Sequence, residues 1–156
     1  IKAIGYLYDI IEDNAKAKGV DVADDDIINK MNMKENCEII KKIASNLNTI
    51  IAVSGPVDMI SDGKDVYLID NGEPIMSKIT GSGCMLTCVI GSFTAVTNPL
   101  DAAIMGSLSM AIAGEKAYRK VQINNEGSGS FRTYLIDELY KMNEETIMKY
   151  GKLYKI

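Results

Sequence analysis

The clearest pattern in the chain is a stripe of apolar residues at helical spacing over residues 32–47. The apolar side chains recur at steps of four and three: Met33, Cys37, Ile40, Ala44 and Leu47. The charged side chains fall mostly on the opposite side, which predicts a helix with one buried face. Cys37 is therefore expected to be a core thiol rather than a reactive one. A shorter helix-like spacing runs from Ile4 to Ile11.

An uninterrupted apolar run, residues 50–53, follows the break at Asn48-Thr49. A short run without polar alternation is typical of a strand buried on both faces, as in a parallel sheet. Short apolar runs then alternate with turn signals: runs at 57–60 and 66–69, turns at Asp62-Gly63 and Asn71-Gly72. Such dipeptides supply the positive φ that two-residue hairpin turns need. We therefore expect residues 57–79 to form a small antiparallel meander attached to a parallel sheet.

Three helices are predicted in the remainder of the chain: about Cys84 to Ala95, about Leu100 to Arg119 with Pro99 near its start, and Phe131 to Met142. The second of them is rich in small residues: Ala102, Ala103, Gly106, Ser107, Ala111, Ala113 and Gly114. Small side chains permit close helix packing. No internal repeat or linker divides the chain, so the sequence indicates a single domain of the α/β class.

Composition narrows the possible functions. The 156 residues are 47% hydrophobic and 24% charged, which is ordinary for a globular protein. Aromatic residues make up 6% and Trp is absent, so the core is expected to be aliphatic. The chain has no His, which excludes a Ser-His-Asp triad, a His base and a His-ligated zinc from it. A net charge of -4 without a basic stripe argues against nucleic acid as a partner.

The three cysteines, Cys37, Cys84 and Cys88, form neither a CxxC pair nor a disulfide framework. Free thiols favour a reducing compartment, and we expect a cytoplasmic protein. No apolar stretch approaches the roughly 20 residues of a membrane span. No signal peptide opens the chain. The first residue is Ile1 rather than Met, so we expect a start codon upstream and a chain that is a fragment.

Carboxylates gather in the acidic stretch at residues 21–26. They could bind a divalent cation, or they could form a solvated loop. The spacing and the glycine of an EF-hand are missing, which favours the loop.

The segment Lys78-Ile79-Thr80-Gly81-Ser82-Gly83-Cys84-Met85 is the most informative one chemically. It is expected to lie between a strand and an apolar helix, where two glycines allow a tight turn. The first N–H groups of a helix lack intrahelical partners, and with the helix dipole they form an anion site. A phosphate suits such a site. The segment is neither a Walker loop nor a Rossmann fingerprint, and a plain Gly-rich turn is the alternative reading.

This segment is similar to the carboxy-terminal signature of the ribokinase-like superfamily, in which a Gly-rich anion hole precedes a helix. The last position is usually an Asp there; the Cys84 found here is typical of one branch, the hydroxyethylthiazole kinases. Further elements resemble that family in order and spacing: Lys18-Gly19-Val20-Asp21, residues 48–55, Val57-Asp58, Asp62-Gly63, Asn71-Gly72 and Gly127-Ser128-Gly129-Ser130-Phe131. The resemblance covers nearly the whole chain.

Three positions depart from the family pattern, and one part of the family is absent. Ser54 stands for a Thr, Pro56 for a Glu, and Ser128 for a Pro. The loss of the Glu could weaken a metal or water contact. The amino-terminal half of the family, with its acidic magnesium-side residues, has no counterpart, so residues 1–156 resemble the carboxy-terminal part of a single kinase domain.

The resemblance implies a ribokinase-like three-layer α/β/α fold with a parallel sheet and a small antiparallel meander, present in part. It implies transfer of the ATP γ-phosphoryl, with Mg²⁺, to the hydroxyl of 4-methyl-5-(2-hydroxyethyl)thiazole, in a homotrimer whose active site lies at a subunit interface. The alternatives are another vitamin kinase, acting on hydroxymethylpyrimidine or pyridoxal, and a non-catalytic half-enzyme.

The resemblance also implies residue roles. Gly81, Ser82, Gly83 and the Cys84 N–H would form the anion hole, and the Cys84 thiol would lie beside the substrate hydroxyl. Gly81 would touch the thiazole through its backbone. Ser54 and Thr80 are expected to bind ATP, and no metal ligand is expected in this chain. Cys88, one turn after Cys84, is expected in the core. Because a free thiol has a pKa of about 8.5, we expect the anion hole to contribute more to the rate than the thiol.

Overall fold

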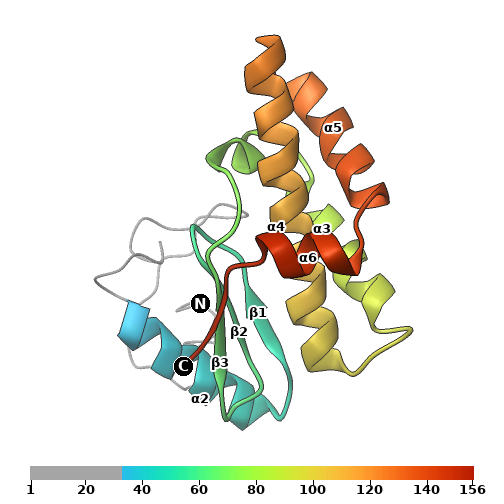
Figure 1. Ribbon diagram of the computed structural model, residues 1–156. Helices are drawn as coiled ribbons and strands as arrows, with labels where there is room; N and C mark the ends of the chain where they lie inside the picture. The colour runs from blue at the N-terminus through green and yellow to red at the C-terminus, as the bar shows by residue number, and fades with distance from the viewer. Residues whose placement is uncertain (1–32) are drawn as a thin grey trace. The chain divides into compact units, whose positions relative to one another are not determined.

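The computed structural model describes residues 33–156 (Figure 1). The helix-like spacing at residues 4–11, the acidic stretch and the Lys18–Asp21 element lie outside them. The chain divides into two compact units: Ile1–Leu68 with Tyr154–Ile156, and Ile69–Leu153. No helix in the described range has both the length and the apolarity that crossing a membrane requires.

The first unit is built on helix α2 (Met33–Leu47), close to the predicted 32–47. Its apolar stripe packs on the strands, in a cluster of Cys37, Ile40, Met59, Val66 and Leu68. Burial raises the pKa of the Cys37 thiol, with a smaller effect of the nearby Glu38 carboxylate, so the thiol is kept protonated. The expectation of a core cysteine is confirmed.

Helix α2 ends at the position that the sequence indicates. Asn48 takes a left-handed conformation with φ 47°. The Asn48 N–H donates to the Ser45 carbonyl over 3.2 Å, and the Thr49 N–H donates to the Ala44 carbonyl over 3.1 Å. This pair of bonds is the Schellman motif, which caps the last carbonyls of a helix.

The sheet has the strand order β1-β2-β3-β4, with β1 (Ile51–Val53), β2 (Asp58–Ser61), β3 (Val66–Ile69) and β4 (Leu153–Lys155). β1 pairs antiparallel with β2, with Ala52 opposite Ile60. β2 and β3 form the expected hairpin, in which the Asp62 carboxylate accepts from the backbone of the turn. Val66 and Ile156 exchange two hydrogen bonds, which joins the end of the chain to β3.

Two expectations about the sheet differ from this arrangement. A parallel sheet is not found among residues 33–156, because β1 pairs only with the antiparallel β2 and stands at one end of the strand order. β1 is also not buried on both faces: Ile51 and Val53 pack toward the α2 cluster, and Ala52 between them is exposed. The alternation follows from the period of two along a strand.

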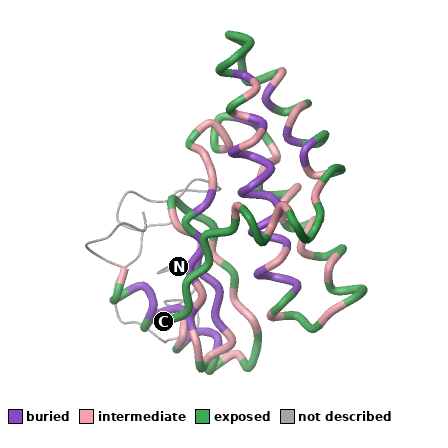
Figure 2. The backbone as a smooth tube through the Cα atoms, viewed as in Figure 1, coloured by how far each residue is buried: buried purple, intermediate pink, exposed green. Residues whose placement is uncertain are grey.

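The second unit packs helices around α4 (Pro99–Asn124). Its elements are the 3₁₀ helix η2 (Pro74–Lys78), α3 (Ser82–Phe93), α4, α5 (Ser128–Tyr140) and α6 (Glu144–Tyr150). α3 and α5 both pack on α4, and Figure 2 shows buried residues along most of α4. The core cluster consists of Ile79, Met110, Ala113, Ala117, Val121, Phe131 and Leu135.

The long helices agree with the prediction, and their ends differ by a few residues. Asn98 caps α4 by accepting from the Asp101 N–H over 3.0 Å. The helix continues past the expected Arg119, because Val121 still lies in the core, and it ends where Asn125 turns left-handed with φ 51°. Three elements are not predicted from the sequence: η2, α6 and β4. Residues 74–78 therefore form η2 rather than part of the meander.

Gly106 is a point of close packing between α3 and α4. A Cβ at Gly106 would lie 2.8 Å from the Ile90 Cα and 2.7 Å from its Cγ1. Because the obstructing atoms include backbone, a side-chain rotation at Ile90 cannot make room. The expectation that small residues allow close helix packing is confirmed here.

We predict that Gly106→Ala lowers the free energy of unfolding by about 1–3 kcal/mol, the usual cost of overpacking. Gly91→Ala is the matched control on α3, because no atom of residues 33–156 lies within 4 Å of its added Cβ. The control should raise stability by up to about 1 kcal/mol through helix propensity. Urea denaturation of the two variants measures both effects; equal stabilities would contradict the close approach of α3 and α4.

Candidate active site

The candidate site is the turn that joins η2 to α3. Ile79, at the end of η2, is buried in the core of the second unit. Gly81 then takes a left-handed conformation with φ 89° and serves as the N-cap of α3. Thr80, between them, is exposed. The turn therefore follows a 3₁₀ helix rather than the strand that was expected.

Backbone N–H groups of the first turn of α3 form the chemically active part of the site. The first hydrogen bond within the helix runs from the Met85 N–H to the Gly81 carbonyl, 2.9 Å. The N–H groups of Ser82, Gly83 and Cys84 have no hydrogen-bond acceptor in the described part of the chain. They point along the helix axis with the positive end of the helix dipole, which suits an anion.

The helix starts at Ser82, two residues before the predicted start. The difference changes the roles of the two glycines. Of the two, Gly81 alone has a positive φ. Gly83 lies inside the helix, and its added Cβ would meet no atom of the described chain within 4 Å. The expectation that both glycines serve the tight turn is therefore wrong for Gly83.

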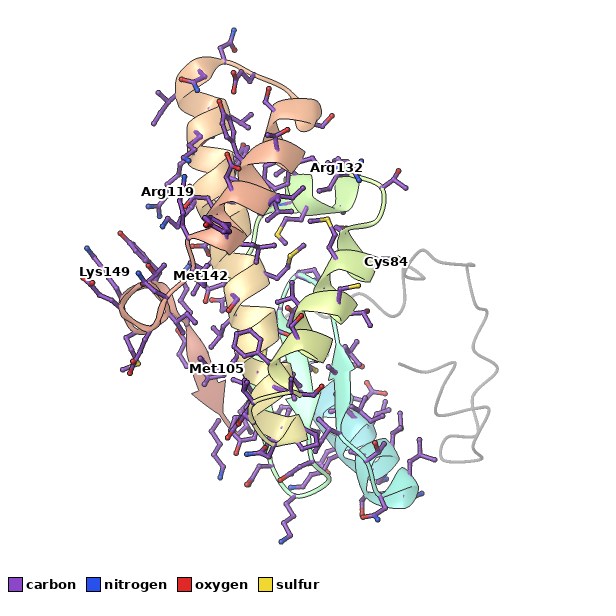
Figure 3. The ribbon with its side chains drawn as sticks, turned by 90° about the vertical axis from the view of Figure 1, so that its right-hand side faces the viewer. Cys84, Met105, Arg119, Arg132, Met142 and Lys149 are labelled. Carbon is purple, nitrogen blue, oxygen red and sulfur yellow. The ribbon has the colours of Figure 1, made fainter. Side chains whose placement is uncertain are left out.

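Cys84 is the third residue of the helix, and its side chain is exposed. Figure 3 shows Cys84 on the side of α3 that faces away from α4. Cys88, one turn later, is also exposed, so its expected place in the core is wrong. The reason is that α3 packs on α4 along one side, which leaves its opposite side uncovered in the described chain although the helix is apolar.

Five of the six predicted site residues lie in one turn of the second unit, and the sixth belongs to the first unit. Thr80 through Cys84 are consecutive in the turn. Ser54 belongs to the other compact unit, where it is exposed directly after β1.

Asp58, at the start of β2, is a titratable group that is not among the predicted site residues. Its carboxylate accepts from the Gly55 N–H over 2.9 Å, which closes the loop between β1 and β2. Burial raises the pKa of Asp58 to about 6, and the Gly55 hydrogen bond opposes the shift. The folded form thus favours the protonated acid, and this contribution to stability is lost as the pH rises through about 6.

The turn Gly127–Phe131, which resembles a family element, begins helix α5. Gly127 is its N-cap, and the Phe131 N–H donates to the Gly127 carbonyl over 3.0 Å. Phe131 is fully buried in the same core cluster as Ile79, and Met85 packs against that cluster. The first turns of α3 and α5 are therefore held by one apolar core.

Comparison with known proteins identifies the family. Residues 4–145 match the family described as the hydroxyethylthiazole kinase family. The chain belongs to the hydroxyethylthiazole kinase family. It is 69% identical to hydroxyethylthiazole kinase 2 of Methanosphaera stadtmanae, over 100% of this chain and 55% of the relative. It is 50% identical to hydroxyethylthiazole kinase of Methanobrevibacter smithii, over 95% of this chain and 52% of the relative.

A solved structure with the same family name also matches this chain. The hydroxyethylthiazole kinase protein from Pyrococcus horikoshii OT3 matches with a TM-score of 0.73 and 36% identity, over 79% of this chain and 47% of that chain. The α/β fold is thus that of a thiazole kinase structure. The chain spans about half the length of the curated relatives that it matches.

We predict that Gly81→Ala destabilises the protein by on the order of 1–2 kcal/mol, because an L-residue is strained at the left-handed φ. Gly83→Ala should leave stability unchanged or raise it, since alanine suits a helix better than glycine. Thermal unfolding of the two variants tests this difference. A larger loss for Gly83→Ala would mean that the helix does not begin at Ser82.

Proposed function

We propose that the protein containing this chain transfers the γ-phosphoryl of ATP to the hydroxyl of 4-methyl-5-(2-hydroxyethyl)thiazole, in thiamin biosynthesis and salvage. Membership of the hydroxyethylthiazole kinase family supports this proposal. The structural observation that carries it is the turn at Gly81, which presents three backbone N–H groups beside an exposed thiol. An anion site beside a group that can accept a proton as a thiolate suits phosphoryl transfer to a hydroxyl.

The backbone of Gly81, Ser82, Gly83 and Cys84 would form the anion hole. Its N–H groups would stabilise the charge on the phosphoryl group during transfer, which is usually a large catalytic effect. Cys84 would also place its sulfur beside the substrate hydroxyl, and its thiolate form would take up the hydroxyl proton and become the thiol. Gly81 would contact the thiazole through its backbone.

Ser54 and Thr80 would contact ATP. Both side chains are exposed and carry hydroxyl groups that can donate to phosphate oxygens. Mg²⁺ is implied by the family. Within residues 33–156 no group of three or more His, Cys, Asp or Glu side chains is placed to hold a metal ion.

The chain would form the carboxy-terminal part of a single cytoplasmic, ribokinase-like domain of three layers. Two observations support this: the chain spans about half of its relatives, and β1 stands at one end of the strand order with Ala52 exposed. Further strands could extend the sheet in parallel at β1. We also propose a homotrimer, which sedimentation of the complete gene product would test.

The test is an ATP-consumption assay on the complete gene product, with the thiazole alcohol against the hydroxymethylpyrimidine alcohol. We expect turnover with the thiazole alcohol. Turnover with the pyrimidine alcohol alone would favour another vitamin kinase, and no turnover with either would favour a non-catalytic protein. Residues 1–156 alone should be inactive, and activity of that chain would contradict the proposed division of the domain.

Within this proposal, we predict that the backbone donors matter more than the thiol. Gly83→Pro deletes one N–H in the first turn of a helix, where proline is tolerated. It should lower kcat about a hundred- to a thousandfold, the usual cost of one lost oxyanion donor. Cys84→Ala should cost less, because phosphoryl transfer has a loose transition state. Cys84→Asp should retain activity, because a carboxylate accepts a proton readily.

Gly83→Ala is the control, since it keeps the N–H that proline removes. The measurement is kcat of the four variants at neutral pH. If Cys84→Ala proves the most damaged, the thiol and not the anion hole dominates catalysis.

A further inference from the structure

Glu115 is a buried carboxylate in the middle of α4 that connects segments distant in sequence. Its Oε1 accepts hydrogen bonds from the Asn71 Nδ2, 3.0 Å, and from the Gly72 N–H, 3.1 Å. The same oxygen accepts from the Lys152 Nζ over 3.0 Å. Burial raises the pKa of Glu115, but these hydrogen bonds together lower it below its usual value, so the acceptor is ionised at neutral pH.

Asn71 extends this network to the carboxy-terminal segment. Its Nδ2 also donates to the Tyr150 carbonyl, 3.0 Å, and its Oδ1 accepts from the Lys152 N–H, 2.7 Å. The side chain is buried and uses both ends. The sequence context of Asn71 suggests the first residue of a hairpin turn. In the structure Asn71 instead links the segment after β3 to residues 150–152.

Gly114, the residue before Glu115 on α4, contacts the helix η2. A Cβ at Gly114 would lie 2.5 Å from the Met76 Sδ, so Met76 occupies the space that the glycine leaves. Ile79 then packs with Ala113 and Ala117 of the same helix. The segment 71–79 is therefore fixed to one stretch of α4 at its start, its middle and its end, and the turn at Gly81 follows directly.

We propose that Glu115 is a positioning residue for the candidate anion hole and that residues 150–152 belong to the scaffold of that site. By fixing Asn71, Gly72 and Lys152, Glu115 holds η2 on α4 so that Gly81 presents the N–H groups of residues 82–84 in one orientation. The inference rests on the proposed function. Small misplacements of catalytic donors cost large factors in rate.

The chain offers a matched control in Glu138, on α5. Glu138 is also a buried carboxylate, and it pairs with Lys116 at 3.1 Å, Lys120 at 2.6 Å and Lys141 at 3.7 Å. Neither Glu138 nor its lysines belong to the segment 71–84. Loss of Glu138 removes a comparable ion-pair network from the same helical unit without touching the support of the turn.

The experiment compares Glu115→Ala, Glu115→Gln and Glu138→Ala in the complete gene product. Glu115→Ala should lower kcat tenfold or more, with KM for the thiazole alcohol changed less than threefold, because donors that act in the transition state are displaced. Glu115→Gln should recover most of kcat, since its amide oxygen still accepts from Asn71 and Gly72. Glu138→Ala should keep kcat within twofold of the parent despite a similar fall in Tm.

Hydrogen exchange of the backbone amides of residues 79–86 provides a second readout that needs no activity. Exchange should be faster in Glu115→Ala than in Glu138→Ala. Equal exchange and equal kcat in these two variants would overturn the proposal. If the parent protein does not phosphorylate the thiazole alcohol, the proposed function fails, and the exchange comparison still decides whether Glu115 positions the turn.

Lys152→Met covers the case in which Glu115→Ala does not fold. The lysine side chain is half exposed, so its replacement spares the core. It removes one of the three donors to Glu115 and should speed exchange at residues 79–86, with a fall in kcat of a few fold. No change in either quantity would exclude the Lys152 side chain from the scaffold.

Discussion

Close packing on α4 is the constraint on which the second unit depends. At Gly106 the backbone of α3 comes so near that a single methyl group would meet the Ile90 Cα, and at Gly114 the space of a side chain is filled by Met76. Protein interiors are packed to crystal-like density, so such contacts fix the positions of the elements that make them. α4 therefore fixes α3 and η2, the two elements that the Gly81 turn joins (Figure 1).

The position of the candidate site follows from that packing. Ile79 is anchored in the core on one side of the turn, and Met85 packs on the same core on the other. Gly81 changes the chain direction between these anchors through its left-handed φ. The N–H groups of residues 82–84 are consequently held by the backbone and the core, so their geometry does not depend on the rotamer of any side chain in the turn.

Features that depend on local signals are predictable from the sequence, and features that depend on remote partners are not. The end of α2 at Asn48 and the start of α4 at Pro99 follow from capping residues near the helix ends. The turn at residues 78–85 follows from Gly81 and the apolar helix after it. β4 is not predictable, because its side chains are all exposed and its partner strand β3 is far away in sequence. Asn71 carries a turn signal, but its contacts with Glu115 and Lys152 are equally remote.

At position 84 the backbone N–H is the proposed anion donor, and the side chain is the proposed base. This separation of roles explains why a thiol is acceptable there. Cys84 is exposed and has no packing role in the described chain, whereas its N–H is fixed by the first turn of α3. In the proposed kinase, a loose transition state requires fixed donors more than a strong base. The side chain at this position is therefore free to be a weak base without loss of the fold or of the anion hole. The same reasoning places the stricter constraint on Gly81, whose conformation sets the direction of every donor that follows it.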